Sequence, residues 1–287
     1  MARVLIAGCG DVGTALGLRL HDDGHEVWGL RRRPDRLPPA IRGIAADLAA
    51  PSGLDALPAG IELVCYTAAA GGAGDAAYRA AYVDGVRNLL AALRDGGHPA
   101  RRFCFVSSTS VYGQDRGEWV DEDSPTEPNR YTGRRLLEGE ALVRAAPMQG
   151  VVVRLAGIYG PGRERLIRQV LDGKPCQAEP PSYTNRIHRD DCAGVLRHLL
   201  TIDDPAPVYI GVDNAPAPQC EVYAWLAERL GVPPPVHERA ADGEAARMNK
   251  RCRNERLRAS GYRFRYPTYR EGYADVLKDM GLGKATD

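Results

Sequence analysis

Three glycines near the start of the chain have the spacing and the setting of a phosphate-binding turn. Gly8, Gly10 and Gly13 follow a short apolar run and open a stretch with helical periodicity. Gly8 would permit a tight turn, Gly10 the close approach of backbone to a pyrophosphate, and Gly13 the close packing of helix on strand. A plain glycine turn is the alternative. Backbone contacts to a dinucleotide are expected from Gly8, Gly10, Asp11, Val12 and Gly13.

Arginines follow the second predicted strand, at the position that selects between nicotinamide cofactors. An acidic residue there would bind the ribose 2′-hydroxyl of NAD, whereas this chain continues from Leu30 into Arg31, Arg32 and Arg33. Guanidinium groups offer charge-assisted hydrogen bonds to a 2′-phosphate. Arg31 and Arg32 therefore indicate NADP as the preferred cofactor, with NAD also admissible. The alternative is a solvated basic turn in an arginine-rich protein.

Further cofactor contacts are expected at the ends of other strands. Asp47 could accept a hydrogen bond from the adenine amino group, or it could be an ordinary turn residue. The cofactor site is expected to include, besides the glycine turn and the arginines, Asp47, Leu48, Thr67, Ala68, Ala69 and Ser107.

Short apolar runs alternate with helical patterns through the first two thirds of the chain, which predicts an α/β fold. Strands that are apolar throughout are typical of a parallel sheet covered on both faces, here a Rossmann-type doubly wound sheet. Strands are expected at 3–7, 26–30, 61–67, 103–107, 151–155 and 208–211, and helices at 13–22, 78–93, 133–144, 190–200 and 221–230.

Proline and glycine become frequent after Tyr159, and the regular alternation ends there. We expect a nucleotide-binding domain of residues 1–157 with 189–212. A small substrate lobe would comprise 158–188 with 213–287, interleaved with the first domain as one structural unit.

Composition excludes several classes of protein. With 287 residues, 44% hydrophobic residues and a net charge of +1, the chain is neither disordered nor basic enough to suggest nucleic acid as a partner. Nowhere do about 18 apolar residues follow one another, so no membrane span is expected. The seven cysteines are scattered, which favours a reducing, cytoplasmic location, and their spacing predicts no metal site.

Four segments together resemble the extended and atypical short-chain dehydrogenases/reductases, the superfamily of NAD-dependent epimerases and dehydratases. The resemblance runs nearly end to end and is specific because the segments occur in order. They are the glycine turn Ala7–Gly13, the segment Ser107–Gly113 (SSTSVYG), the segment Arg154–Gly162 (RLAGIYGPG) and the segment Asn185–Asp191 (NRIHRDD).

The resemblance implies a catalytic serine, tyrosine and lysine. The serine falls on Ser108 and the tyrosine on Tyr131, 23 residues later, but the lysine expected one helical turn further on is replaced by Arg135. In this chemistry a phenol, with an ordinary pKa near 10, exchanges a proton with the substrate oxygen and is assisted by the nearby cation. A guanidinium is larger and planar, so Arg135 could supply the charge without the geometry.

The family also suggests the size of the substrate and the assembly. Relatives that act on sugar nucleotides often have asparagine where this chain has Gly157, and they tend to have longer lobes, so a small-molecule substrate is expected. Arg163, Arg165 and Arg186 could bind a carboxylate or phosphate, or they could be solvated loop arginines. Family members commonly form homodimers through the helices expected here at 78–93 and 133–144.

Three functions are compatible with these residues. The first is an NADP(H)-dependent oxidoreductase that transfers hydride to or from a small carbonyl or alcohol. The second is an epimerase or dehydratase of a sugar or sugar nucleotide, which would keep its cofactor tightly bound. The third is an NADP-sensing or regulatory protein whose active site is degenerate, as Arg135 suggests.

Overall fold

Seven strands form one sheet in the computed structural model, which describes residues 1–239 and 249–282. Their order is β12-β7-β5-β4-β1-β2-β3, and the sheet is parallel, as the pairs β3–β2, β2–β1, β1–β4 and β4–β5 illustrate. Strands β2 and β3 are added on one side of β1, and β4 and the later strands on the other, so the strand order reverses between β1 and β4. This is where doubly wound sheets bind ligands. The strands are β1 (Arg3–Ala7), β2 (Glu26–Arg31), β3 (Arg42–Ala45), β4 (Leu63–Tyr66), β5 (Arg102–Ser108), β7 (Gln149–Leu155) and β12 (Val208–Gly211).

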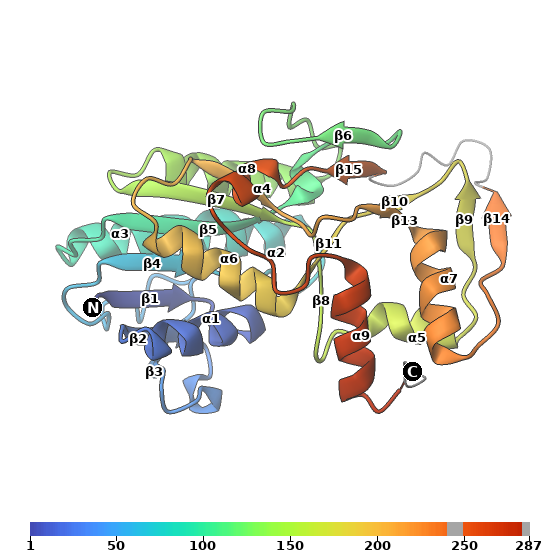
Figure 1. Cartoon of the computed structure of the whole chain (residues 1–287). Helices are drawn as coiled ribbons and strands as arrows, with labels where there is room; N and C mark the ends of the chain where they lie inside the picture. Colours follow the sequence, from blue (N-terminus) through green and yellow to red (C-terminus); the bar gives the residue numbers. More distant parts are fainter. Residues whose placement is uncertain (240–248, 283–287) are drawn as a thin grey trace. The chain divides into compact units, whose positions relative to one another are not determined.

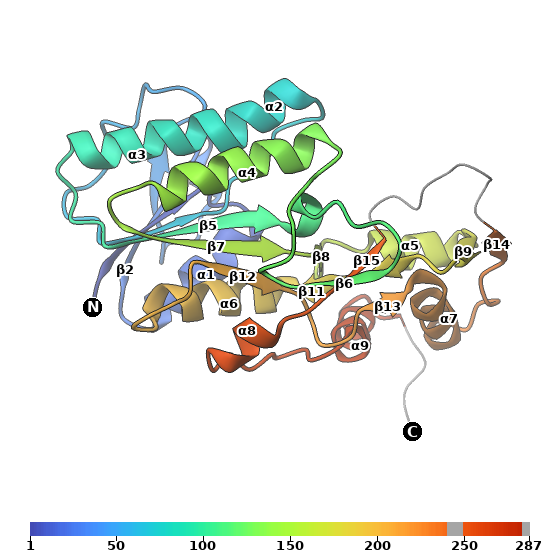
Figure 2. The same ribbon diagram turned by 90° about the horizontal axis from the view of Figure 1, so that it is seen from above.

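Helices cover both faces of this sheet. Figures 1 and 2 show α1 and α6 on one face and α2, α3 and α4 on the other. The helical elements are α1 (Asp11–Asp22), η1 (Pro34–Arg36), α2 (Asp75–Arg79), η2 (Ala80–Asp84), α3 (Gly85–Asp95), η3 (Thr109–Val111), α4 (Tyr131–Arg144) and α6 (Arg189–Thr201).

The remaining elements are short strands and helices. The strands pair as β6–β15, β8–β11, β9–β14 and β10–β13. They are β6 (Glu118–Val120), β8 (Gly157–Tyr159), β9 (Cys176–Glu179), β10 (Tyr183–Thr184), β11 (Arg186–His188), β13 (Ala217–Pro218), β14 (His237–Arg239) and β15 (Lys250–Cys252). The helices are α5 (Arg165–Leu171), α7 (Gln219–Leu230), α8 (Glu255–Ala259) and α9 (Tyr269–Asp279).

Most predicted elements are present, and two differences have physical causes. The strand β3 was not expected, because only Ile44 of its four residues is buried and the strand includes Gly43, which makes the apolar signal weak. The single helix expected at 78–93 begins earlier, at Asp75, and contains the π-helical turn η2 between α2 and α3. Such turns are set by packing and leave little trace in the sequence.

The chain divides into two units by contact. Unit 1 comprises residues 1–111, 126–154 and 192–209, and unit 2 comprises 112–125, 155–191 and 210–287, of which 240–248 and 283–287 lie outside the described residues. The prediction assigned 112–125 to the nucleotide-binding domain, whereas the structure places it in unit 2. The reason is the pairing of β6 with β15, about 130 residues further along the chain, which periodicity does not reveal.

Each unit has its own apolar core. In unit 1, the strands β1 and β4 are almost entirely buried, as expected for strands covered on both faces. The core of unit 2 includes Tyr159, Ile167, Tyr223, Leu226 and Tyr273. Local signals define the helices around it: Thr268 and Glu271 form a capping box at the start of α9, and Gly231 ends α7 in the left-handed conformation.

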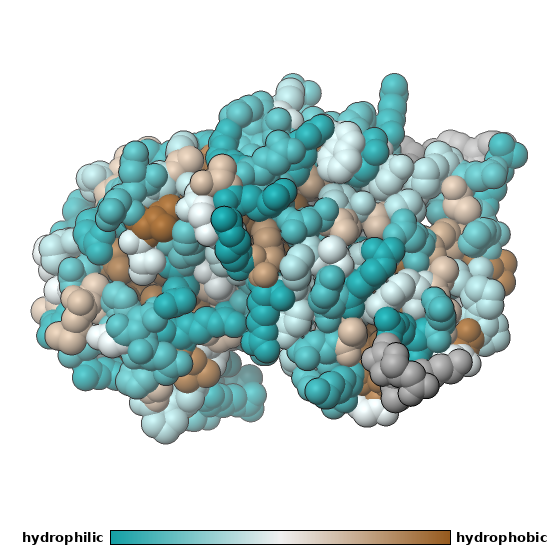
Figure 3. All heavy atoms as spheres, in the orientation of Figure 1, coloured by the Kyte–Doolittle hydropathy of each residue, from teal (hydrophilic) through white to brown (hydrophobic). Residues whose placement is uncertain are grey.

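The surface is mixed in polarity. On the face drawn in Figure 3, hydrophilic residues predominate and apolar ones are scattered. Within residues 1–239 and 249–282, no helix combines the length and the apolar character that crossing a bilayer requires.

Candidate nucleotide and catalytic site

The glycine turn lies between β1 and α1 and is fastened to its neighbours by backbone hydrogen bonds. The N–H groups of Gly8 and Cys9 both donate to the carbonyl of Leu30 at the end of β2. Gly8 has a φ of +80°, and a Cβ there would lie 2.3 Å from the Cα of Ala68. The position therefore requires glycine, both for its conformation and for the close approach of the segment after β4.

Gly10 and Gly13 occupy different surroundings. A Cβ on Gly13 would lie 2.8 Å from Thr67 Oγ1 and 3.0 Å from Ile6 Cγ2, so this glycine permits helix α1 to pack on the sheet. A Cβ on Gly10 would meet only the Gly8 carbonyl, at 3.8 Å. The space beside Gly10 is thus open to a ligand, which is what close approach of a pyrophosphate requires.

The N-terminus of α1 is available to an anion. Gly10 is its N-cap, and none of the described side chains makes a capping hydrogen bond there. The first N–H groups of a helix lack intrahelical partners and carry a partial positive charge. The turn and the start of α1 therefore fit a pyrophosphate held by the backbone of Asp11, Val12 and Gly13.

Two arginines at the end of β2 lie beside this turn. Nη1 of Arg31 donates to the carbonyl of Cys9 at 3.2 Å, which holds the guanidinium against the glycine turn. Nη2 of Arg32 approaches Gly71 in the loop after β4, 3.9 Å from the position a Cβ would take. A guanidinium has five N–H donors, so the bond to Cys9 leaves Arg31 donors for a phosphate.

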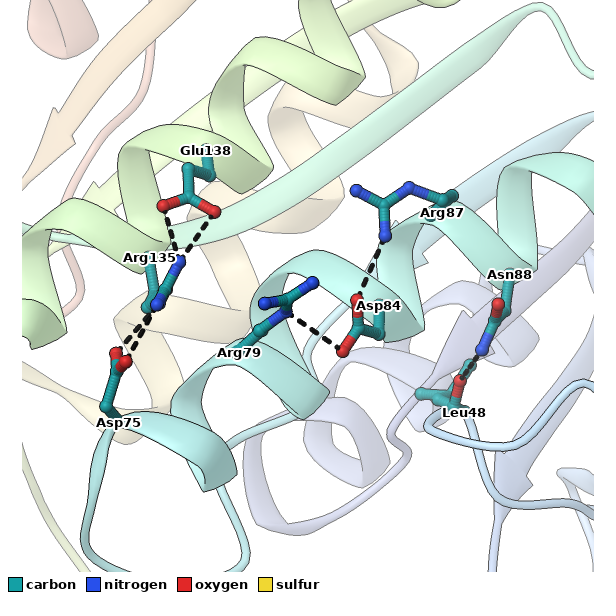
Figure 4. Close-up of polar contacts among 8 residues, drawn as sticks. All are labelled: Leu48, Asp75, Arg79, Asp84, Arg87, Asn88, Arg135 and Glu138. Carbon is teal, nitrogen blue, oxygen red and sulfur yellow. Dashed lines mark hydrogen bonds and ion pairs between the residues drawn. The ribbon is translucent and has the colours of Figure 1, made fainter.

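The other residues predicted to contact the cofactor also lie at strand ends in unit 1. Thr67 Oγ1 donates to the Gly8 carbonyl at 3.0 Å, and Ala68 packs against Gly8. Asp47 is exposed and accepts a hydrogen bond from the Ala49 N–H, which agrees with its alternative role as a turn residue. Leu48 is buried, with its carbonyl bound by Asn88 (Figure 4), and Ala69 is exposed.

Ser107 belongs to a buried polar network that local patterns did not predict. Its hydroxyl donates to Glu140 on α4 at 2.7 Å, and the same carboxylate accepts two hydrogen bonds from Arg154 on β7, at 3.0 and 2.8 Å. Glu140 is fully buried. The network connects α4 to β5 and β7, and any contact of Ser107 with a cofactor would use its backbone.

Ser108 and Tyr131 are at adjacent element ends. Ser108 ends β5, and its hydroxyl accepts a hydrogen bond from the Ser110 N–H at 3.1 Å. Tyr131 begins α4, which packs so closely on the segment after β5 that a Cβ on Gly133 would lie 2.6 Å from the Ser110 carbonyl. The phenol oxygen of Tyr131 accepts from the Gly74 N–H at 3.1 Å. Both side chains are partly exposed, so a substrate could reach them.

Arg135 is held by two carboxylates. Its Nε and Nη2 donate to the two oxygens of Asp75 at 2.8 and 2.7 Å, and Nη1 donates to both oxygens of Glu138 at 2.8 and 3.1 Å (Figure 4). The Arg135 guanidinium lowers the pKa of Asp75 through these hydrogen bonds. Arg135 thus provides a cation one helical turn from Tyr131, but the cation is compensated and its donors point to α2 and along α4.

In unit 2, the histidine and tyrosine of the family segments have structural surroundings. His188 is buried, its Nδ1 accepts from the Asp190 N–H, and its ring meets Tyr159 edge-on at 5.3 Å. Burial lowers the pKa of His188 and raises the pKa of Tyr159. The ring of Tyr159 also stacks on Tyr273 at 4.3 Å. These contacts agree with packing roles.

The three arginines expected on the substrate side differ in exposure. Arg163 and Arg165 are exposed, whereas Arg186 is buried. The Nη2 atom of Arg186 donates to Thr184 Oγ1 at 2.6 Å, and its guanidinium lies 5.5 Å from the centre of the Tyr269 ring. Arg186 is therefore part of the interior of unit 2 and not a solvated loop residue.

Unit 2 also contains two features that sequence spacing did not indicate. Cys176 and Cys220 form a disulfide, and His237 lies beside them. These residues come from β9, α7 and β14, which are adjacent only in the folded chain. A separate hollow of about 570 Å³ is lined by α8 and the segment after it, including Arg258, Tyr262 and Arg263, and contains none of the predicted site residues.

Comparisons with known proteins agree with this geometry. The model of the "NAD dependent epimerase/dehydratase family" matches residues 4–201. Protein YeeZ of Escherichia coli K12 is 29% identical over 285 residues, 93% of this chain and 97% of YeeZ. The 3-diazoavenalumate denitrifying reductase of a Streptomyces species is 30% identical over 255 residues, 81% of this chain and 83% of the reductase.

Solved structures show the same architecture. A protein from Methylobacillus flagellatus, described as an NAD-dependent epimerase/dehydratase, is 40% identical, with a TM-score of 0.82 over 98% of this chain and 99% of its own. MoeE5 in complex with UDP-glucose and NAD is 24% identical, with a TM-score of 0.81 over 98% of this chain and 99% of MoeE5, and shares the fold.

Proposed function

This chain belongs to the NAD dependent epimerase/dehydratase family, and from that premise we propose that it is an NADP(H)-dependent oxidoreductase acting on a carbonyl or alcohol of a small substrate. One observation carries the proposal. The Arg31 guanidinium is hydrogen-bonded to the Cys9 carbonyl and so lies at the glycine turn. In an NAD-selective protein a carboxylate occupies this position at the end of β2. The similarity to the Streptomyces protein, which is named a denitrifying reductase, supports a reduction as the reaction and does not indicate the carbonyl or alcohol.

The residues of unit 1 supply the remaining groups for this reaction. Bound NADPH would supply the hydride. The Ser108 hydroxyl would donate a hydrogen bond to the carbonyl oxygen and orient it. Tyr131 would donate the proton that this oxygen takes up on reduction, and the Gly74 N–H would keep the phenol in place.

The surroundings of Gly157 support a small substrate. A Cβ at this position would lie 3.2 Å from the Asn185 carbonyl, which is tighter than an ordinary contact. An asparagine, as in many sugar-nucleotide enzymes of the family, would therefore require β8 and the residue before β11 to separate slightly. The lack of this asparagine makes an epimerase or dehydratase of a sugar nucleotide the weaker alternative.

Cofactor preference tests the proposal directly. Calorimetric titration of cofactor-free protein is expected to give a Kd for NADPH at least about tenfold below that for NADH, because each charge-assisted hydrogen bond contributes roughly 1.5 to 3 kcal/mol. In Arg31→Asp the preference should reverse. The exposed Arg36, on η1, offers a matched control, and Arg36→Asp should retain the native preference. Failure of both cofactors to bind would overturn the assignment of the glycine turn.

The role of Tyr131 needs a separate test. With a substrate found by screening carbonyls and alcohols, Tyr131→Phe is expected to lower kcat about 100-fold or more, because the variant has no proton to transfer. Tyr78 provides the control, since its ring lies edge-on to Tyr131 at 5.5 Å and Tyr78→Phe removes the same atom. Equal kcat for native protein and Tyr131→Phe would exclude Tyr131 as the proton donor.

A second candidate function is favoured by the contacts of Arg135. Because Asp75 and Glu138 compensate its charge, the chain could bind NADP(H) and respond to it without efficient turnover. NADPH binding together with an absence of turnover across the whole substrate panel would favour this regulatory function, whereas robust native turnover would exclude it.

A further inference from the structure

Two cysteines and a histidine from three elements of unit 2 meet at one point. Cys176 begins β9, Cys220 lies in the first turn of α7, and His237 begins β14. Figure 1 shows these three elements side by side. Cys176 and His237 are register partners in the parallel pair β9–β14, and Cys176 and Cys220 form a disulfide with a Cα–Cα distance of 5.3 Å.

The three potential ligand atoms are close enough to share one ion. The two sulfurs and an imidazole nitrogen all lie within 4.8 Å of one another. Two thiolates and an imidazole form a donor set that Zn²⁺ prefers, with Zn–S distances of about 2.3 Å and Zn–N distances of about 2.0 Å. Hard cations such as Mg²⁺ and Ca²⁺ prefer oxygen ligands, which this group lacks.

We propose that Cys176, Cys220 and His237 form a zinc site that is available when the Cys176–Cys220 disulfide is reduced. Two electrons and two protons from thiol reductants convert the disulfide to two thiols, while two reductant thiols become a disulfide. Zn²⁺ then binds as the two cysteines release their protons, and water completes the tetrahedron. The disulfide and the zinc complex exclude each other, because sulfurs bonded to one another cannot both be thiolate ligands.

The surroundings permit this exchange. In a tetrahedral complex the sulfurs would lie about 3.8 Å apart, so the side-chain torsions of the two cysteines must change when the disulfide opens. His237 is exposed, which leaves a route for the ion and space for the water ligand. Cys176 and Cys220 are themselves buried, at 2% and 9% exposure, so a reductant and the ion would reach them from the side of His237. Cys65 and Cys104 are also buried register partners, in β4 and β5, but among the described residues no third ligand is grouped with them.

Zinc titration of the purified protein tests the proposal. The chain is reduced with a phosphine, which removes the disulfide without adding a thiol, and Zn²⁺ is titrated in competition with a chromophoric chelator. We expect one tight equivalent in the reduced native protein and loss of that equivalent after oxidation. Cobalt in place of zinc should show thiolate-to-metal charge-transfer absorption, which reports sulfur ligation directly.

Variants separate this site from other metal binding. His237→Ala should weaken zinc binding about tenfold or more, and the double variant Cys176→Ser with Cys220→Ser should abolish it. His21→Ala, at another exposed histidine, and Cys65→Ala with Cys104→Ala should bind zinc as the native protein does. If the cysteine variants do not fold, the exposed His237 still gives an interpretable variant. Equal zinc affinity in reduced native protein and His237→Ala, or no zinc binding by reduced native protein, would overturn the proposal.

Discussion

The guanidinium of Arg135 makes a two-point ion pair with the carboxylate of Asp75, with N–O distances of 2.8 and 2.7 Å. The two residues are 60 positions apart; Arg135 lies in the second turn of α4, and Asp75 is the first residue of α2. A lysine has a single nitrogen and would not reproduce this geometry. The replacement of the family lysine is thus accompanied by a partner that suits arginine, and it fixes the cation beside the helix turn that contains Tyr131.

Two variants of Arg135 should distinguish the effect of its positive charge on kcat from the effect of its guanidinium shape. Arg135→Gln is expected to lower kcat by roughly tenfold to 100-fold, because the cation one helical turn from the proton donor is lost. Arg135→Lys keeps the charge and should stay within about fivefold of native kcat. The measurement is steady-state turnover at saturating NADPH. Arg134→Gln, at the adjacent exposed residue of α4, serves as control; native kcat in Arg135→Gln would show that the reaction needs no cation there.

Gly8 and Gly10 should respond differently to alanine. Gly8→Ala places a Cβ 2.3 Å from Ala68 Cα at a φ of +80°, so we expect a loss of roughly 2 kcal/mol or more in the free energy of unfolding. Gly10→Ala meets no close neighbour, and its melting temperature should remain near native while NADPH affinity falls about tenfold or more. Calorimetry and thermal denaturation together distinguish the two. Native affinity in Gly10→Ala would remove Gly10 from the cofactor site.

Removing one partner of the buried ion pair Glu140–Arg154 should lower the free energy of unfolding. Arg154→Met leaves a fully buried carboxylate without its main partner, and we expect a loss of about 3 to 5 kcal/mol in the free energy of unfolding. Arg144, exposed and 3.8 Å from the same carboxylate, is the matched control, and Arg144→Met should change this free energy by less than about 1 kcal/mol.

A double variant completes the measurement of this pair. Arg154→Met with Glu140→Gln removes both charges and should be less destabilised than the sum of the single variants, as measured by urea denaturation. Additive losses would show that the two side chains contribute independently.

Asp213 should make stability depend on pH in a particular direction. Burial raises the pKa of Asp213 to about 7, from an ordinary value of 3.8. Between roughly pH 4 and pH 7 the folded chain therefore holds more protons at this site than the unfolded chain, so the contribution of Asp213 to stability falls as pH rises through that window. Asp213→Asn has no carboxyl group to titrate at this position. Its melting temperature should therefore rise relative to that of native protein as pH increases from about 4 to 7.

Thermal denaturation across pH 4 to 8 compares the two proteins. Asp203→Asn, at an exposed position, should show a difference from native protein that does not change with pH. A constant difference between Asp213→Asn and native protein across the same range would show that Asp213 does not titrate within it.

Local sequence patterns predicted most of the sheet strands and helices of unit 1. The strands β1 and β12 have the expected bounds, because a run of apolar residues covered on both faces is visible in the sequence. The weakly apolar strand β3 and the π-helical turn η2 were not anticipated, since pairing and packing define them.

The sequence by itself determined the family, the sheet and the glycine turn, since these depend on residue types at short, regular spacing. Only the tertiary structure decided which side chains Arg135, Glu140 and Cys176 contact. Asp75, Arg154 and Cys220, the partners that connect these residues to other elements, lie 60, 14 and 44 residues away along the chain. Such contacts arise when separate helices and strands pack together, and the order of residues within one element contains no record of its neighbours.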